Sequence, residues 1–349
     1  MVGGNPDVAT TRCQFITFSQ GAPLMIRQLR PRRDGSIALG LLLCTLIPLG
    51  AARVQQGGQI VFQSEVDGNT DIYVMDGDGT NVRRLTDHPT RDHSPRWSPG
   101  GSRIAFVSGR DDSRQVYTMD PDGGAVGRVT ETRTGAQAPA WSQDGGRIAF
   151  FAMYREYGIH SIDRDGQNLR FLTGPPDRKG HPGNHFQEQS GGIDWSPNGW
   201  TLIFNAHGGG PDAASIWAID ADGKNARKLT EGGHDVCQAW SPDGRRILFL
   251  HIGNERGFFT MDPDGRDRTE IFRIEAAGCP RWSASGQEIV FVMDGDIHIV
   301  SATGRNLRRL VELPGDERNP DWFDPAFARA VTARSKIPVA WGRIKRRRD

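Results

Sequence analysis

The chain has 349 residues, of which 36% are hydrophobic and 24% charged, so it is long enough to bury a sizeable core. Lysine and arginine number 43 against 42 aspartates and glutamates, which gives a formal net charge of +1. This balance excludes the strong basic field of a nucleic-acid-binding body, and we expect no nucleic-acid partner.

The first 52 residues read as an extension followed by an export signal. Residues 1–24 resemble no part of a signal, and translation starting at Met25 would leave them out. Residues 25–52 combine an arginine-rich start, an apolar run over residues 37–49 and small residues where a signal peptidase cuts. The run of 13 residues is shorter than the roughly 20 that span a bilayer. We therefore expect a periplasmic or secreted mature chain without a transmembrane span. The alternatives are an uncleaved anchor and, from Arg32 and Arg33, twin-arginine export.

One unit recurs from Gly57 to Phe323. Each copy has a segment ending in Trp-Ser, a Pro/Asp/Gly turn, a β-branched and aromatic run, a variable loop, a second run ending in Asp, another Gly turn and a run usually ending in Leu-Thr. Successive copies lie 40 to 54 residues apart, and apolar residues alternate with period two, which indicates four-stranded sheets repeated around an axis. The repeated tryptophans, which we expect to form the core between blades, are Trp97, Trp141, Trp195, Trp240, Trp282 and Trp322.

The repeats are displaced by one strand. With the four strands called a to d, the first copy (residues 59–86) lacks strand a, and the last strand a (residues 319–322) lacks strands b to d. Each supplies what the other lacks, which would remove the open edge of a linear array. The sequence thus predicts an all-β fold: a six-bladed β-propeller of four-stranded antiparallel blades over residues 53–325, closed by the C-terminal strand pairing with the N-terminal strands.

Two cysteines remain in the mature chain, because Cys13 and Cys44 precede the predicted cleavage site. Cys237 and Cys279 each lie three residues before their tryptophan, on neighbouring inner strands. We expect these strands to lie farther apart than the roughly 5.5 to 6 Å between α-carbons that a disulfide needs. The prediction is two free, buried thiols.

Strand order separates two faces. The a–b and c–d turns share one face and are short and formulaic, with the Asp and Gly that tight turns need; calcium loops are the alternative. The b–c and d–a loops share the other face, which we call the loop face, and are long, variable and polar, so we expect binding there. The candidates for partner contact on the loop face are Arg91, Asp92, His93, Arg110, Asp111, Tyr154, Arg155, His185, His207, His234, Asp235 and His251.

Histidines gather in the loops of three consecutive blades. Convergence of three or four imidazoles would suit a divalent transition metal, although the spacing does not force it, and ordinary surface or hydrogen-bonded histidines are the alternative. No other cofactor is predicted. The candidate ligands are His185, His207, His234 and His251. After the propeller, residues 326–349 form a basic tail that is either solvated or in contact with an anionic surface such as lipid headgroups.

The repeat resembles that of a known family. The segments PRWSPGGSRIAFVSG and QAWSPDGRRILFL, the latter followed by FFTMDPDG, are similar to the WD-like propeller repeat of TolB-type proteins. That repeat also occurs in prolyl oligopeptidase relatives and, more distantly, in oligogalacturonate lyases. The resemblance implies a propeller face that docks a protein in the cell envelope. TolB also has an α/β domain ahead of its propeller, which we expect to be lacking here, because the predicted signal ends just before the repeats.

Two functions from different classes follow. The first is an exported non-catalytic propeller that acts as a binding or scaffold module for an envelope protein or glycan. The second is a metal-dependent polysaccharide lyase of the oligogalacturonate type, with the histidines holding the ion and Arg178 or Lys179 as base. A peptidase is not favoured, since the sequence contains no G-x-S-x-G elbow.

Overall fold

The computed structural model describes residues 58–133, 135–152, 158–173, 192–207, 214–231 and 233–327. The predicted extension (1–24) and export signal (25–52), and the tail from residue 328 onward, lie outside these ranges. Within them, no helix has the length and apolar character needed to cross a membrane.

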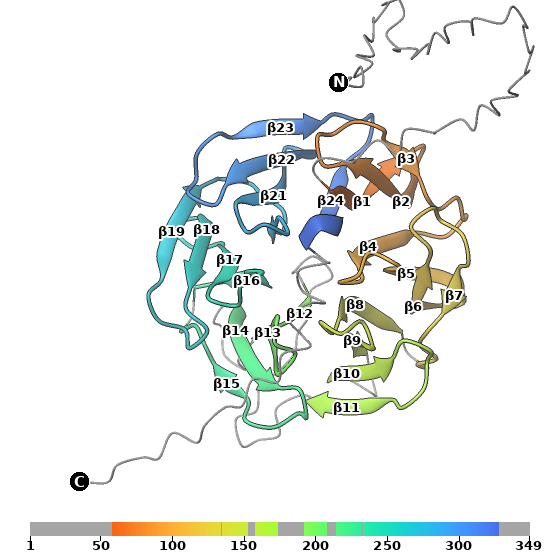
Figure 1. Cartoon of the computed structure of the whole chain (residues 1–349), viewed down its shortest axis with the longest axis horizontal. Coiled ribbons are helices and arrows are strands. Elements are labelled where there is room, and N and C mark those ends of the chain that lie inside the picture. Colours follow the sequence, from red (N-terminus) through yellow and green to blue (C-terminus); the bar gives the residue numbers. More distant parts are fainter. Residues whose placement is uncertain are drawn as a thin grey trace, which may run out of the picture. The chain divides into compact units, whose positions relative to one another are not determined.

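Six four-stranded antiparallel sheets stand around a common axis as the blades of a propeller (Figure 1). We number the blades in chain order and give their strands from the axis outward. Blade 1 has β24 (Glu317–Phe323), β1 (Gln59–Val66), β2 (Asn69–Asp76) and β3 (Arg83–Arg84). Blade 2 has β4 (Asp92–Trp97), β5 (Ile104–Asp111), β6 (Ser113–Met119) and β7 (Gly127–Arg128). Blade 3 has β8 (Ala136–Trp141), β9 (Arg147–Ala152), β10 (Gly158–Asp163) and β11 (Arg170–Thr173).

The second half of the ring repeats this order. Blade 4 has β12 (Ile193–Trp195), β13 (Thr201–His207), β14 (Ala214–Asp220) and β15 (Arg227–Lys228). Blade 5 has β16 (Asp235–Trp240), β17 (Ile247–His251), β18 (Gly257–Met261) and β19 (Thr269–Arg273). Blade 6 has β20 (Arg281–Trp282), β21 (Glu288–Met293), β22 (Asp296–Ser301) and β23 (Arg308–Val311). The predicted six-bladed, all-β architecture is confirmed.

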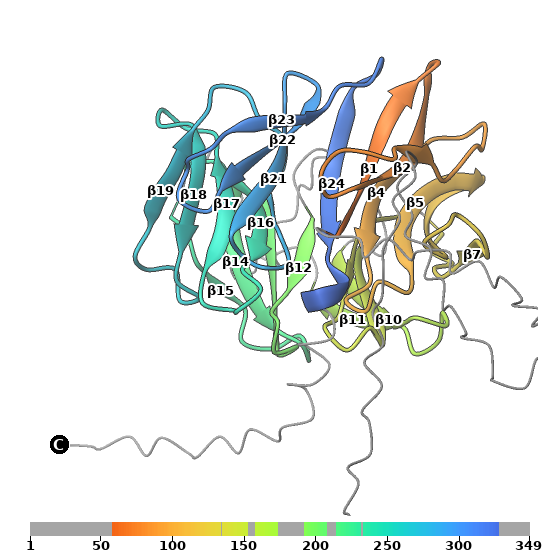
Figure 2. The ribbon, with the colours of Figure 1, turned by 45° about the horizontal axis from the view of Figure 1, so that its top comes forward.

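The ring closes in blade 1, where the last strand pairs with the first. β24 lies antiparallel to β1, with Ile60 opposite Trp322 and Gln59 opposite Phe323 (Figure 2). Phe323 also packs on Trp97 of blade 2, with ring centroids 5.3 Å apart. The predicted closure is confirmed, and it leaves β1 with hydrogen-bonded neighbours on both sides.

The core lies between the blades. Six clusters of buried apolar residues each combine side chains of neighbouring blades, and each has one of the repeated tryptophans within it or packed against it. The second strand of every blade adds a fully buried phenylalanine. These residues are Phe62, Phe106, Phe150, Phe204, Phe249 and Phe291. Each pairs across the sheet with an aromatic residue or a histidine, which explains His160 and His298 as packing residues.

The glycine in each c–d turn is needed for two reasons. It has a φ between 75° and 94°, a left-handed conformation that glycine adopts without strain. A β-carbon at the same place would also lie 2.0 to 3.0 Å from a carbonyl oxygen in or just after the outer strand of the preceding blade; at Gly265 it would lie 2.4 Å from the carbonyl oxygen of Leu229. The equivalent glycines are Gly79, Gly123, Gly166, Gly223, Gly265 and Gly304. The repeated Asp/Gly pattern therefore sets the spacing between blades as well as the turn.

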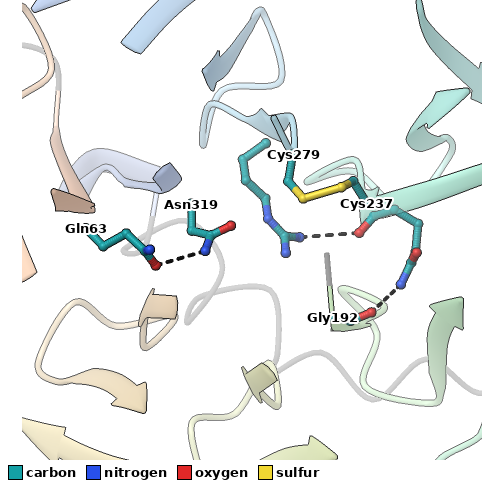
Figure 3. Close-up of a disulfide and its surroundings, with 7 residues drawn as sticks. Gln63, Gly192, Cys237, Cys279 and Asn319 are labelled. Atoms are coloured by element: carbon teal, nitrogen blue, oxygen red, sulfur yellow. Dashed lines mark hydrogen bonds between the residues drawn. A yellow bond between two sulfur atoms is a disulfide. The ribbon is translucent and has the colours of Figure 1, made fainter. Parts of the chain in front are cut away.

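The prediction of two free thiols is wrong. Cys237 and Cys279 form a disulfide between blades 5 and 6, with α-carbons 4.9 Å apart (Figure 3). The inner strands β4, β8 and β16 each carry a β-bulge two to four residues before their tryptophan. The residue three before the tryptophan has a left-handed backbone in five of the six blades. Such a bulge displaces the residue from the ladder, and neighbouring blades meet there; a β-carbon on Gly192 would lie only 3.2 Å from that of Ala138.

Candidate binding pocket on the propeller axis

A polar pocket of about 190 Å³ lies on the axis, on the face that carries the short a–b turns. The six repeated tryptophans contribute to its wall, together with residues of those turns: Ser98, Pro99, Gln143, Pro197, Pro242, Ser283 and Ala284. Residues after β24 take the place of a sixth a–b turn, so that Asp324 and Phe327 also line the pocket. We call this side of the propeller the turn face.

Four charged side chains form one network in the pocket. Arg96 Nη2 lies 2.8 Å from Asp194 Oδ1, and Arg96 Nε lies 3.6 Å from Asp321 Oδ1. Arg281 Nη1 lies 3.7 Å from Asp194 Oδ1. The four side chains are only 10 to 16% exposed. Two cations and two carboxylates are thus held largely out of water around the axis.

The two carboxylates also hold the blades together. Asp321 Oδ2 accepts a hydrogen bond from the backbone N–H of Trp97, and Asp194 Oδ2 accepts one from the backbone N–H of Trp240, both at 2.7 Å. Each bond joins a blade to the next one around the ring. Burial raises the pKa of Asp194 to about 6, although Arg96 favours the ionised form. Burial likewise raises the pKa of Asp321. The pocket therefore loses negative charge as the pH falls below about 6.

Sequence reasoning missed this pocket, although the sequence contains a signal for it. The residue before each repeated tryptophan is charged in four blades and alanine in the other two. In chain order these residues are Arg96, Ala140, Asp194, Ala239, Arg281 and Asp321. A charge beside a core tryptophan, at a position that repeats around a ring, must lie near the axis.

Two of the predicted loop-face carboxylates are buried within their blades. Asp92 is fully buried and pairs with Arg110 at 3.0 Å, and the Arg110 guanidinium lies over the rings of Phe106 and Tyr117. Burial raises the pKa of Asp92, while Ser108 and Arg110 favour its ionised form. These groups stabilise blade 2.

Asp235 has the equivalent place in blade 5. It is fully buried, accepts a hydrogen bond from His251 Nδ1 at 2.7 Å and lies 3.8 Å from Arg268. Arg268 in turn lies over Phe249 and Phe259, 4.3 Å from the centroid of the latter. One ring nitrogen of His251 is thus occupied by a hydrogen bond to a buried aspartate.

The other described candidates stay near the loop face. Arg91 donates to Thr70 Oγ1 at 3.1 Å, and the His93 ring bonds Ser94 Oγ at 3.0 Å. Asp111 pairs with Arg128 at 3.3 Å and accepts a short hydrogen bond from the Tyr117 hydroxyl. His234 is exposed and has a left-handed backbone.

The side chains of the remaining candidates lie outside the part of the chain that the structure describes. Tyr154, Arg155 and His185 lie outside the described residues, as do the side chain of His207 and the proposed bases Arg178 and Lys179. Within the described part of the chain, no three His, Cys, Asp or Glu residues form a group that would hold a metal ion. His234 and His251 belong to no such group there.

Comparison with known proteins supports the propeller repeat found in the sequence. A family model described as the TolB beta propeller domain matches residues 50–181. Residues 50–181 therefore carry the TolB-type propeller repeat.

The TolB-type propeller is similar to short parts of two longer proteins. It is 41% identical over 68 residues to an uncharacterized peptidase, YuxL, of Bacillus subtilis, which is 19% of this chain and 10% of that protein. It is 35% identical over 84 residues to the Tol-Pal system protein TolB 1 of Novosphingobium aromaticivorans, which is 24% of this chain and 16% of that protein. The chain therefore spans a small part of each relative.

Its fold is also similar to the crystal structure of TolB from Acinetobacter baumannii. The TM-score is 0.64 at 22% sequence identity, covering 76% of this chain and 66% of that one. At this identity the likeness concerns the fold alone.

Proposed function

We propose that this TolB-type propeller is an exported, non-catalytic binding module that docks an envelope protein at the axial pocket of its turn face. The observation that carries the proposal is the pocket itself. Its charged groups are paired with one another and with backbone amides, which suits a preorganised recognition site. This places the proposed contact on the turn face, opposite the loop face that sequence reasoning favoured.

The size of the pocket supports a protein partner. At about 190 Å³ it is smaller than the roughly 300 to 1,000 Å³ of typical small-molecule sites, and it holds one or two side chains. The short turns around it form a low rim on which the rest of a partner can lie. A projecting residue in the pocket with a surrounding contact ring is the usual arrangement of an interface hot spot.

Two observations support export. The first is the arginine-rich, apolar and small-residue pattern of residues 25–52. The second is the Cys237–Cys279 disulfide, since disulfides persist in oxidising compartments such as the periplasm and are rare in the cytosol. One relative is named a Tol-Pal system protein, which agrees with a role in the envelope.

The test is capture of a partner followed by measurement of its binding to matched variants. The tagged full chain is cross-linked in envelope extract, the captured protein is identified by mass spectrometry, and its affinity is measured with purified components. Ala284→Arg fills the pocket from a half-exposed turn position and should weaken binding at least tenfold. His234→Ala on the loop face is the control and should bind as the wild type does. Loss of binding in the control with no change in Ala284→Arg would move the site back to the loop face and reject the proposal.

A further inference from the structure

The disulfide lies beside the axial pocket, where the backbone alone holds blade 6 weakly. Cys237 and Cys279 are 3 and 6% exposed, near the residues of other blades that face the axis (Figure 3). β20, which follows Cys279, has two residues that pair with β21, and one further backbone hydrogen bond runs from the N–H of Gly278 to the carbonyl of Val292 in β21 at 2.8 Å. The inner strands β4, β8 and β16 each have six. The inner edge of blade 6 thus has few ladder hydrogen bonds to fix it.

Residues just after each cysteine contact one another and the residues that line the pocket. Gln238, next to Cys237, donates through Nε2 to the carbonyl of Gly192 in blade 4. Arg281, two residues after Cys279, donates through Nη1 to the carbonyl of Gln238 at 3.4 Å and lies 3.7 Å from Asp194. The disulfide therefore joins the two strands between which this chain of contacts runs.

We propose that the Cys237–Cys279 disulfide is a positioning element of the axial pocket, which holds Arg281 beside Asp194 by fixing the start of β20 against β16. The disulfide acts through Arg281, which adds a second cation near Asp194 beside the closer Arg96. The inference deepens the proposed function, because it treats the axial pocket as the site.

Formation of the bond needs an oxidant, for which a protein disulfide donor is the appropriate class. The thiolate of one cysteine attacks the donor disulfide, which gives a mixed disulfide and releases one donor thiolate. The second cysteine, as thiolate, then displaces the other donor sulfur. The chain loses two protons and two electrons, and the donor is reduced to its dithiol. Since both cysteines are buried in the folded chain, the exchange occurs before the blades close over them.

The test is the titration of Asp194, followed by its side-chain carboxyl resonance in carbon NMR. Loss of the Arg281 guanidinium from beside Asp194 removes a cation that favours the ionised form. The double variant Cys237→Ala/Cys279→Ala should therefore titrate with a pKa higher than that of the wild type by about half a unit, a threefold change in proton affinity. Arg281→Gln should give the same shift. Adding Arg281→Gln to the cysteine variant should give no further shift, because both changes remove one interaction.

Several results would overturn the proposal. An unchanged Asp194 titration in the cysteine variant would do so, as would a triple variant whose shift equals the sum of the two. Alkylation of the peptides containing Cys237 and Cys279 without prior reduction would show that the bond is absent. If the alanine variant does not fold, wild-type chain compared before and after reduction, and Cys237→Ser/Cys279→Ser, give the same comparison. Failure of partner binding with the predicted shift intact would reject the proposed function and leave this inference standing.

Discussion

We predict that Glu317 makes the closure of the ring dependent on pH. It lies on β24, fully buried, opposite Ser64 of β1. Ser64 Oγ is 3.5 Å from its Oε1, while Oε2 has no hydrogen-bond partner. Burial raises the pKa of Glu317 from 4.5 to about 8, and the carboxylates of Asp296 and Asp316 add to this. Asp296 is itself paired with Arg309, and Asp316 with Arg318. No cation is directly paired with Glu317 among the described residues.

The sign of the effect follows from proton binding. Between about pH 4.5 and 8 the folded chain holds a proton on Glu317 that the unfolded chain releases, so the free energy of unfolding falls as the pH rises. The contribution is fully present below about pH 4.5 and lost above about pH 8. At about 1.4 kcal/mol per pH unit, the loss is about 3 kcal/mol by pH 7 and about 5 kcal/mol by pH 9.

Glu317→Gln removes this ionisation while keeping the shape of the side chain. At pH 4.5, where the wild type keeps the proton in the folded chain and in part in the unfolded chain, the variant should be less stable by up to about 1 kcal/mol, because the new amide N–H groups are buried. At pH 7 the variant should be more stable by about 2 kcal/mol, after a cost of about 1 kcal/mol for burying the new amide N–H groups. The advantage should grow further at pH 9.

The assay is urea unfolding of both proteins at pH 4.5, 7 and 9, with stability obtained by linear extrapolation. Glu65→Gln, an exposed carboxylate on the neighbouring strand, is the control and should show no such trend. A stability difference between Glu317→Gln and the wild type that is the same at all three pH values would refute the reasoning.

Three further predictions concern the blades. Gly265→Ala should lower the free energy of unfolding by more than 2 kcal/mol, because the new β-carbon adds a clash with Leu229 to the strain of the left-handed backbone. Gly199 has the same left-handed backbone but open space around it, so Gly199→Ala should cost about 1 kcal/mol in the same urea unfolding assay. Equal losses would contradict the proposed role of the turn glycine. Arg96→Ala removes the cation paired with buried Asp321 and leaves Asp194 with the more distant Arg281. It should destabilise the chain by about 3 to 5 kcal/mol at pH 7 and by less at pH 5, while exposed Arg83→Ala should change little. A loss independent of pH would count against this prediction. Reduction of the disulfide, which closes a segment with a sequence separation of 42, should lower stability by about 4 kcal/mol in calorimetry, and an unchanged melting temperature would argue against it.

Local chemistry, repeated six times, determined the architecture. A strand pattern with turn residues at fixed places specifies a blade whatever surrounds it, and the displaced first and last copies fix the closure of β24 on β1. The tryptophans and strand phenylalanines were also readable as core, since the same residue at the same place in every unit can only be packing. Apart from the closure, which follows from the count of strands, these features depend on neighbours close in sequence.

Only the tertiary structure decided what meets on the axis. Arg96, Asp194 and Asp321 belong to three blades, and Asp194 is 98 residues from Arg96 and still farther along the chain from Asp321, so no spacing in the sequence predicts their contact. The left-handed bulges that bring Cys237 to Cys279 were likewise invisible, because each departs from the strand pattern by a single residue. Asp92 and Asp235, which the sequence predicted to lie on the surface, are buried and pair with Arg110 and His251. Their roles depend on how close separate blades and side chains come in space, which a repeat pattern does not contain.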